Sequence, residues 1–225
     1  MIKENLKGKK FVASYSGGKD SMLSIYRAIK AGLEPLCLII TYNKDRNLSW
    51  FHGVPKGVLD SVSKSLNIPI WLIETTGEQY AQNFEKALAK AKEEGAEVCI
   101  FGDIDLECHL KWCTERCENV GIEPCFPLWQ EDRKTLVYEF LDSGFTSTFT
   151  VINTKMLDDK FLGLTMTKEI CEQIEKEGAD VCGENGEYHT FVSDGPIFKE
   201  KVKFKLGDKI ENDGYSILPI LSVDK

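Results

Sequence analysis

The sequence lacks both a long apolar run and an excess of positive charge. Its longest strongly apolar stretch, residues 36–40, is far too short to span a membrane, and the first eleven residues contain no apolar segment typical of a signal peptide. Acidic residues outnumber basic ones by 36 to 28, so the formal net charge is −8. Such a surface repels nucleic acid and anionic membranes unless a local basic patch is present, and none is evident along the chain. We therefore expect a cytoplasmic protein with no membrane partner and no nucleic-acid partner.

The sequence also lacks low-complexity segments and flexible linkers. Its 225 residues are enough for one large domain or two small ones, each with a buried core. The residue pattern changes character near residue 127. We therefore expect one domain over residues 1–126 and a second domain over residues 127–225.

Short β-branched runs alternate with amphipathic stretches in the first half of the chain. Such alternation with short connections predicts an α/β fold, in which a Rossmann-like parallel sheet carries helices on both faces. The expected strands are residues 11–15, 36–42, 70–73 and 98–101, and the expected helices are residues 20–31, 56–66, 79–94 and 107–119.

The second half predicts a smaller α+β domain. Its expected helices are residues 133–141 and 168–176, and its expected strands are residues 146–152, 186–192, 201–206 and 215–221. Residues 93–103 and 176–187 also resemble one another: each has a helix end, a Gly, a short Val-Cys strand, and then a Gly followed by an acid. Because open α/β sheets build their sites past the ends of strands, we expect an acid at each of these places to lie near a site.

Eight cysteines in a protein of the reducing cytoplasm are expected to be thiols or metal ligands, not disulfides. His109, Cys113 and Cys117 recur every four residues, so they share one face of a predicted helix. A structural zinc needs four ligands, which a single helix supplies awkwardly. We expect packed thiols here and no zinc.

Residues 14–21 read S-Y-S-G-G-K-D-S, between a predicted strand and a predicted helix. Gly17 and Gly18 allow the backbone to approach a ligand closely, and the unpaired N–H groups of the helix start attract an anion. Lys19 adds a positive charge. Asp20 suits such a place mainly when a Mg²⁺ lies between its carboxylate and the phosphates. The alternative is a Ser/Gly turn that caps the helix.

The loop does not match a Walker A sequence, because Asp follows Lys19 and Ala13 stands where the first Gly is required. The pattern S-G-G-x-D-S resembles instead the PP-loop of the ATP pyrophosphatase superfamily, whose members transfer AMP and release pyrophosphate.

A second unusual segment, C-G-E-N-G-E-Y-H-T-F-V, spans residues 182–192. Gly183 and Gly186 bracket a turn that presents Glu184 and Glu187, and alternation along a strand puts Glu187 and His189 on one face. These groups suit a cationic or amine substrate or acid–base chemistry. A hairpin loop with solvated acids is the equally weighted alternative.

The loop, S-W-F-H (49–52), G-D-I (102–104), P-L-W (127–129), the 182–192 segment and D-G-P-I-F (194–198) follow in this order. Together they resemble the diphthine–ammonia ligase family over residues 11–200. The resemblance implies the adenine nucleotide alpha-hydrolase type of fold. It also implies a ligase that adenylates the diphthine carboxylate on elongation factor 2, or another carboxylate acceptor, with ATP and Mg²⁺. Ammonia then displaces AMP. A homodimer is compatible with this assignment.

The resemblance also implies which residues form the site. The nucleotide would be bound by Ser14, Ser16, Gly17, Gly18, Lys19, Asp20, Ser21, His52, Gly102 and Asp103, with Asp20 also meeting the metal. The substrate and ammonia would be bound by Glu184, Asn185, Gly186, Glu187 and Thr190. The catalytic groups would be Asp20, Glu184, Glu187 and His189. The family typically has Gly where this chain has Asn185, and Asn tolerates the left-handed backbone that we expect there.

Two other functions fit parts of the sequence. A non-catalytic nucleotide-binding module would keep the loop without using Glu184 or Glu187. A tRNA-thiolating enzyme that adenylates its substrate would use a cysteine pair to carry sulfur, although the net charge of −8 speaks against an RNA substrate.

Overall fold

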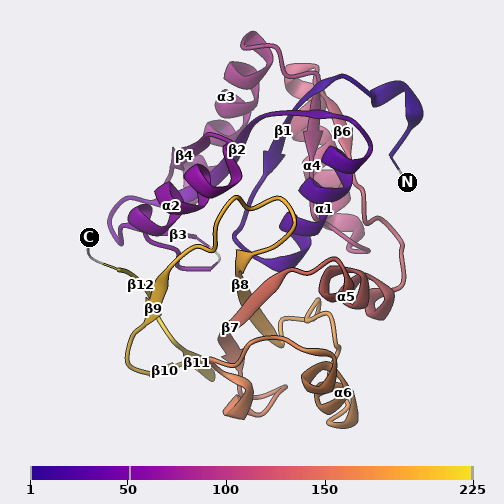
Figure 1. The fold of residues 1–225 in the computed structure, drawn as a ribbon. Coiled ribbons are helices and arrows are strands. Elements are labelled where there is room, and N and C mark those ends of the chain that lie inside the picture. The colour runs from indigo at the N-terminus through magenta and orange to yellow at the C-terminus, as the bar shows by residue number, and fades with distance from the viewer. Residues whose placement is uncertain (1, 51, 224–225) are drawn as a thin grey trace. The chain divides into compact units, whose positions relative to one another are not determined.

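The structure is a computed structural model that describes residues 2–50 and 52–223. These residues fall into two compact units. The first unit consists of residues 2–16, 20–50 and 67–131, and the second consists of residues 17–19, 52–66 and 132–223. The second unit therefore contains the middle of the glycine-rich loop as well as the C-terminal part of the chain (Figure 1). Among the described residues, no helix is both long and apolar enough to cross a membrane.

The first unit is built on a mainly parallel sheet, which confirms the predicted fold class. Its strands are β1 (Lys10–Ser14), β2 (Glu34–Asn43), β3 (Leu48–Ser49), β4 (Ile70–Glu74), β5 (Val98–Ile100) and β6 (Glu123–Cys125). They follow the order β3-β2-β1-β5-β6, with β4 also paired to β2, and only the short β3 is antiparallel. Its helical segments are η1 (Glu4–Leu6), α1 (Lys19–Lys30), η2 (Gly77–Gln79), α3 (Tyr80–Glu93) and α4 (Glu107–Val120).

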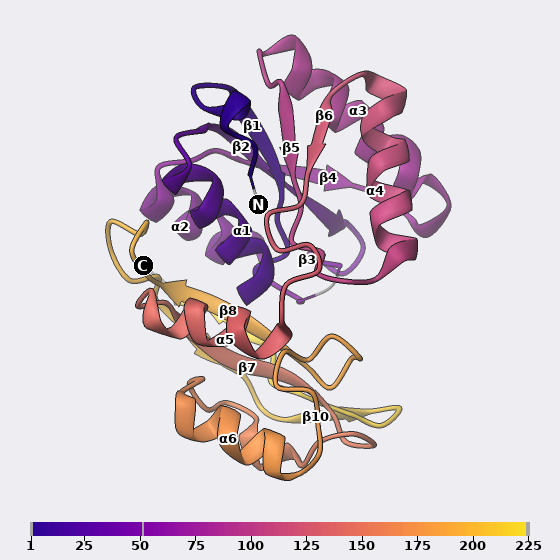
Figure 2. The ribbon, with the colours of Figure 1, turned by 90° about the vertical axis from the view of Figure 1, so that its right-hand side faces the viewer.

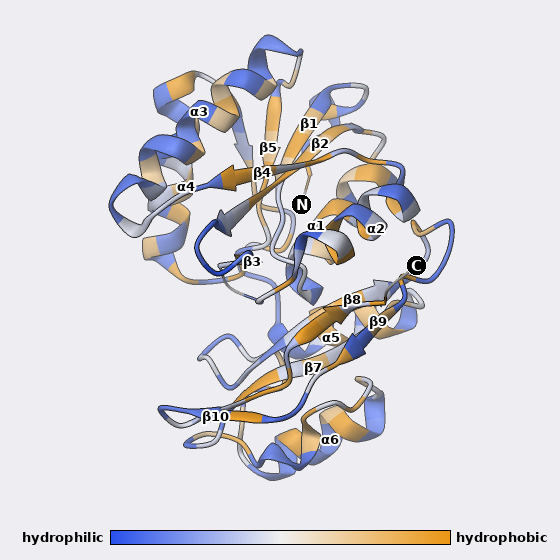
Figure 3. Cartoon of the chain, turned by 90° about the vertical axis from the view of Figure 1, so that its left-hand side faces the viewer, coloured by the Kyte–Doolittle hydropathy of each residue, from blue (hydrophilic) through white to orange (hydrophobic). Residues whose placement is uncertain are grey.

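The strands are buried on both faces, as is typical of a parallel sheet whose connections are helices. Phe11, Val12 and Ala13 are fully buried although they alternate in direction, so β1 has an apolar neighbour on each face. The helices α3 and α4 cover one face and α1 covers the other (Figure 2). The hydrophobic residues gather on the strands, and α3 and α4 are largely hydrophilic on their outer sides (Figure 3).

The order of the parallel strands places a switch point between β1 and β5. From β1 the chain adds β2 and β4 on one side, and it then returns to add β5 and β6 on the other side. In open α/β sheets, ligands bind at the carboxyl ends of the two strands that flank such a reversal. The loop that begins at Ser16 follows β1, and the segment that begins at Phe101 follows β5.

The second unit carries two antiparallel sheets. One has the order β10-β11-β7-β8, and the other pairs β9 with β12. The strands are β7 (Thr146–Asn153), β8 (Tyr188–Asp194), β9 (Phe204–Leu206), β10 (Ile210–Asn212), β11 (Tyr215–Ile217) and β12 (Ile220–Ser222), and the helices are α2 (Lys56–Leu66), α5 (Arg133–Asp142), η3 (Asp159–Phe161) and α6 (Lys168–Lys176). Side chains such as Phe149 and Phe191, which are fully buried, form its core.

Several expectations for the second half are corrected. The similarity of residues 93–103 and 176–187 does not extend to structure, because Val98 and Cys99 lie in β5 whereas Val181 and Cys182 lie in a turn. Of the strand expected over 201–206, only Phe204–Leu206 forms one. The strand expected over 215–221 divides into β11, which pairs with β7, and β12, which pairs with β9, because Pro219 has no N–H to donate to a neighbouring strand.

No basic patch is evident along the sequence, but three alternating lysines share one groove in the structure. Lys201, Lys203 and Lys205 line one groove of the second unit. In an extended chain, alternate side chains point to the same side, so three lysines separated by single apolar residues gather there without forming a continuous run of charge.

Candidate functional site

The first unit supplies the two ends of the glycine-rich loop. The backbone N–H of Ser16 donates to the Ser21 hydroxyl oxygen at 3.3 Å, and the two hydroxyls lie 3.1 Å apart. These contacts fold the loop back on the first turn of α1, where the helix N–H groups are not used within the helix. Asp20 is partly buried and Ser21 is buried in the same turn. Such a turn is suited to hold phosphate groups.

Gly102 brings the segment after β5 against the start of α1. A Cβ atom at this position would lie 2.8 Å from the backbone nitrogen of Ser21 and 3.0 Å from the carbonyl carbon of Asp20. Because backbone atoms cannot move aside as a flexible side chain can, only glycine permits this approach. The two segments of the predicted nucleotide site therefore meet at the switch point of the sheet.

Asp103 lies next to Gly102 and is held by α4. Its Oδ1 lies 3.1 Å from Nδ1 of His109, and its Oδ2 accepts from the Cys113 thiol at 3.8 Å. The burial of Cys113 and the nearby Asp103 carboxylate raise the pKa of that thiol. Two of the three residues predicted to share one helix face, His109 and Cys113, therefore orient Asp103, while Cys117 is fully buried in the core beside Cys99.

The second unit brings the middle of the glycine-rich loop to β8. The carbonyl oxygen of Gly17 accepts from the N–H of Val192 at 2.9 Å. Gly17 has a φ of 97°, which favours glycine, and a Cβ there would lie 3.2 Å from a methyl group of Val54. The loop conformation therefore depends on having glycine at position 17.

Lys19 joins this loop to the 182–192 segment. Its side chain is buried, its ammonium donates to the carbonyl oxygen of Cys182, and the same group lies 5.4 Å from the centre of the Tyr188 ring. Tyr188 is in turn fixed by a 2.5 Å hydrogen bond from its hydroxyl to the carbonyl of Val181. Two motifs that are more than 160 residues apart in the sequence therefore meet within one unit.

His52 lies beside the start of β8. Its Nδ1 is 2.8 Å from the carbonyl oxygen of Thr190. A carbonyl only accepts, so Nδ1 carries the proton and Nε2 keeps its lone pair in the neutral ring. Burial and the nearby His189 lower the pKa of His52 to about 3. The rings of His52 and His189 meet edge to face with their centres 4.9 Å apart, and Phe51 of the same motif lies outside the described residues.

Two carboxylates shape the loop between Asp180 and Glu187. Asp180 accepts from the N–H of Cys182 at 2.9 Å and from the N–H of Glu184 at 3.1 Å. Glu187 is buried, with an exposed fraction of 2 %, and accepts from the N–H of Asp180 at 3.2 Å and the N–H of Asn185 at 3.0 Å. Each carboxylate thus replaces the backbone partners that a loop lacks. Glu184 is partly buried in the span between them.

Asn185 does not use the left-handed backbone that we expected of it, because it is not among the residues with positive φ. Its side-chain amide instead donates to Glu187 at 3.0 Å, and its side-chain oxygen accepts from Arg133 at 3.2 Å. The positive φ values of this turn occur at Gly183 and Gly186, at 73° and 92°. Asn185 therefore contributes side-chain contacts that the usual Gly cannot make.

Sequence reasoning missed Asp180 and Arg133. Arg133, at the start of α5, donates to Asp180 at 2.6 Å and so ties this helix to the loop. Asp180 lies two residues before the 182–192 segment. Its role is to accept from backbone N–H groups, which every residue type except proline has, so the sequence gives no sign of it. A signal did exist for Arg133, since a basic residue is unfavourable in the first turn of a helix unless something nearby compensates it.

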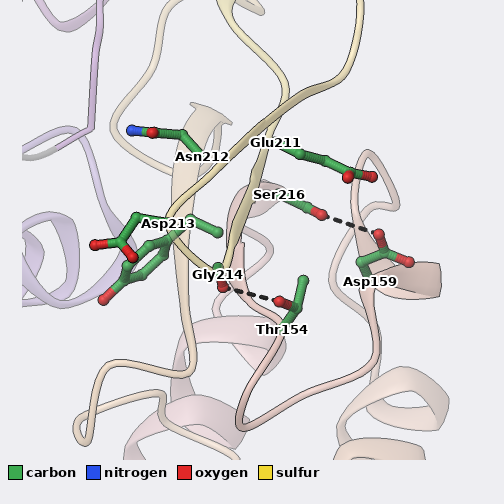
Figure 4. A pocket seen from close by; sticks show the side chains of 8 residues that line it. Thr154, Asp159, Glu211, Asn212, Asp213, Gly214 and Ser216 are labelled. Carbon is green, nitrogen blue, oxygen red and sulfur yellow. Dashed lines mark hydrogen bonds between the residues drawn. The ribbon is translucent and has the colours of Figure 1, made fainter.

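A separate hollow lies where η3 faces the β10–β11 hairpin (Figure 4). It is rich in acids, but Asp159 accepts from Ser216 at 2.9 Å and from Lys209. These two donors hold the pKa of Asp159 below its usual range. Thr154 donates to the Gly214 carbonyl at 2.9 Å, which closes another edge. These contacts hold the hairpin and give Asp159 a structural role.

Family models and named proteins from several organisms match this chain. The family model of the diphthamide synthase N-terminal domain matches residues 9–124, and the model of the C-terminal domain matches residues 132–221. A rat protein named diphthine–ammonia ligase is 26% identical over 92% of this chain and 87% of its own length. A zebrafish protein of the same name is 25% identical over 93% and 91%. A solved structure from Methanocaldococcus jannaschii, described as a "predicted subunit of tRNA methyltransferase", is 17% identical, with a TM-score of 0.46 over 86% of this chain and 100% of that one.

Proposed function

Because the chain belongs to the diphthamide synthase family, we propose that it is an ATP-dependent ligase that converts a diphthine-like carboxylate to its amide. In this proposal ATP first activates the carboxylate as an acyl-adenylate. One carboxylate oxygen attacks the α-phosphorus, and the bond to pyrophosphate breaks. Ammonia then attacks the acyl carbon, AMP leaves with the bonding electron pair, and a proton from the nitrogen is released.

The contact between Lys19 and the carbonyl of Cys182 carries this proposal. It supports a shared role for a loop suited to phosphates and a loop that presents Glu184. We assign the binding of the ATP phosphates to the residues from Ser16 to Ser21, and we assign Gly102 and Asp103 to the same nucleotide. A magnesium ion that enters with ATP would neutralise phosphate charge, and Asp20 is the residue that would meet it.

The ammonia side is assigned to Glu184 and the two histidines. Glu184 would hold the incoming ammonium ion by charge and hydrogen bonding, and the neutral ammonia formed from it by hydrogen bonding. His52 is too weak a base to take a proton at neutral pH, because its pKa is about 3. Its neutral ring can still accept a hydrogen bond from ammonia, which would orient the nucleophile. His189 is the second candidate for this contact because the two rings are neighbours.

Glu187 is assigned a positioning role. Its carboxylate already accepts from Asp180 and Asn185, so its bonding capacity is used inside the loop. The predicted catalytic role of Glu187 would require these bonds to break. We therefore propose that Glu187 and Asp180 hold the loop in shape while Glu184 contacts substrate.

The buried cysteines give little support to the thiolating alternative. All cysteines except Cys108 are buried, and burial raises the pKa of Cys125 and Cys171 to about 11. A thiol that carries sulfur must reach its partners and ionise readily.

The proposed function is tested by the products of ATP turnover. With ATP, magnesium, ammonium and a diphthine-bearing acceptor protein, we expect AMP and pyrophosphate to form in equal amounts. ADP and phosphate as products would contradict the proposal, and ATP binding without turnover under these conditions would favour a nucleotide-binding module. Lys19→Met should abolish turnover, whereas the exposed Glu172→Gln should leave it unchanged.

A further inference from the structure

A groove with a volume of about 450 Å³ crosses the second unit between β7 and the segment that leads into β9. Three exposed lysines, Lys201, Lys203 and Lys205, line one side of it. Thr148 and Ser193 are among the hydroxyl residues that line the other side. Among the residues that the structure describes, the lining contains no carboxylate. The groove is therefore positively charged on a protein whose net charge is −8.

The backbone fixes the direction of the three lysines. The N–H of Val202 donates to the carbonyl of Ser193 at 2.8 Å, which anchors the extended segment beside β8. Phe204 packs edge to face on the buried Phe191 with ring centres 5.1 Å apart. Because Val202 and Phe204 turn inward, the lysines that alternate with them turn outward together.

These lysines differ from others in the same unit. Lys134, Lys160 and Lys168 each form an ion pair with a carboxylate. Within residues 2–50 and 52–223, the three groove lysines form neither an ion pair nor a side-chain hydrogen bond. Like charges that line one groove repel one another, and a bound anion would relieve that repulsion.

Two hydroxyl groups that line the groove also favour the binding of an anion. Thr148 and Ser193 have exposed fractions of 7 % and 1 %. Across the described part of the chain, neither hydroxyl has a hydrogen-bond partner. Neither oxygen is fully enclosed by the protein, so both can be reached from a groove that also presents positive charge. Hydroxyl donors beside ammonium groups are suited to bind an oxyanion.

We propose that this groove binds a short acidic segment, in extended conformation, of the protein that carries the acceptor carboxylate. The identity of the occupant rests on the proposed function, which requires a protein acceptor. Alternate side chains of an extended peptide repeat every ~6.6 Å, and exposed and less exposed residues alternate with the same two-residue period from Lys201 to Lys205. The charge is confined to three residues, so a short acidic peptide fits it better than a long nucleic acid.

The first experiment measures binding without catalysis. A fluorescent peptide of alternating Asp and Ser is titrated with the full chain at low salt, and its anisotropy is recorded. The triple charge reversal K201E/K203E/K205E should weaken binding by about tenfold or more, because three exposed attractions become repulsions. The control K64E/K155E/K176E changes three exposed lysines of the same unit that lie outside the groove, so it changes the net charge equally. It should weaken binding by less than about threefold.

A milder variant tests the hydroxyls. T148V and S193A together remove both hydroxyls without altering charge, and they should weaken binding by about three- to tenfold. Equal losses in both triple variants would show only a general charge effect and would overturn the proposal. Tighter binding of oligouridylate than of the acidic peptide would also overturn it, in favour of an RNA site.

A second experiment separates this inference from the proposed function. With the acceptor protein, K201E/K203E/K205E should raise the KM for that protein while the KM for ATP stays unchanged. If the wild-type chain releases no pyrophosphate, the proposed function fails, and the peptide titration still decides whether the groove binds acids. If pyrophosphate is released but the KM for the acceptor does not rise, the acceptor does not use this groove and the inference fails alone.

Discussion

The substitution Glu187→Gln separates a positioning role from a catalytic one. The two carboxylate oxygens of Glu187 face three N–H donors, from Asp180 and from the backbone and side chain of Asn185. A glutamine keeps the shape but replaces one oxygen with an NH₂ group, which itself donates. In either orientation, at least one of these donors loses its acceptor, and the buried NH₂ group faces another donor instead. The remaining bonds also lose the assistance of the negative charge.

The expected loss of stability follows from the number of hydrogen bonds that Glu187 accepts. A buried donor without a partner costs about 1–3 kcal/mol, and each bond to a neutral oxygen is weaker than a bond to a carboxylate by about 1 kcal/mol. We expect Glu187→Gln to lower the free energy of unfolding by about 2–4 kcal/mol. For a chain of this size, that corresponds to a fall in Tm of roughly 5–15 °C. Thermal unfolding followed by circular dichroism measures it, with the exposed Glu172→Gln as a control within about 1 °C.

The refuting result is equally specific. If Glu187→Gln keeps the wild-type Tm but abolishes formation of AMP, the carboxylate acts on substrate and the positioning role is wrong. If the Tm falls as expected, turnover measured well below the new Tm should be reduced without being abolished, because Glu184 and Lys19 are still present.

Two further predictions follow from single contacts. Gly102→Ala should weaken ATP binding, measured by calorimetry, by about tenfold or more, because the new Cβ would lie 2.8 Å from the backbone nitrogen of Ser21. The control Gly77→Ala, whose Cβ would meet no atom within 4 Å, should leave the affinity for ATP unchanged. Equal affinities of the two variants for ATP would contradict this account. The folded-state pKa of His52 is lowered to about 3 from an ordinary value of about 6.5, so its contribution to stability is fully present above pH 6.5 and is lost as the pH falls toward 3. Denaturant unfolding between pH 7 and pH 4 should therefore show a smaller loss for His52→Gln than for the wild type, and identical slopes would refute the assignment.

Much of the fold could be predicted because apolar periodicity reflects burial directly. Two helices, α2 and α6, have the predicted ends, and the order of strands and helices in the first unit gives the α/β class. The short strands β3 and β10 were missed, because two or three residues are too few to establish a period.

The site was predictable only in part, for a different reason. Glycine-rich turns and acids are visible in the sequence, so the loop at Ser16 and the segment at Glu184 could be identified. Asp180 could not, because it acts on backbone N–H groups. Nor does the sequence show that Lys19 reaches the carbonyl of Cys182, since that contact depends on the path of the chain between them.

Because all cysteines but one are buried, the reaction of their thiols with a dye measures unfolding of the part of the protein that encloses them. Cys108 is the one exposed cysteine, so a thiol-reactive dye should label the folded chain at a single position. Burial also raises the pKa of Cys37 to about 12, which leaves almost no reactive thiolate there. Each additional thiol that reacts must therefore come from a molecule whose interior has become accessible. Cys171 and Cys182 would report on the second unit, and Cys99 and Cys117 would report on the first, so that the labelling pattern would show which unit had opened.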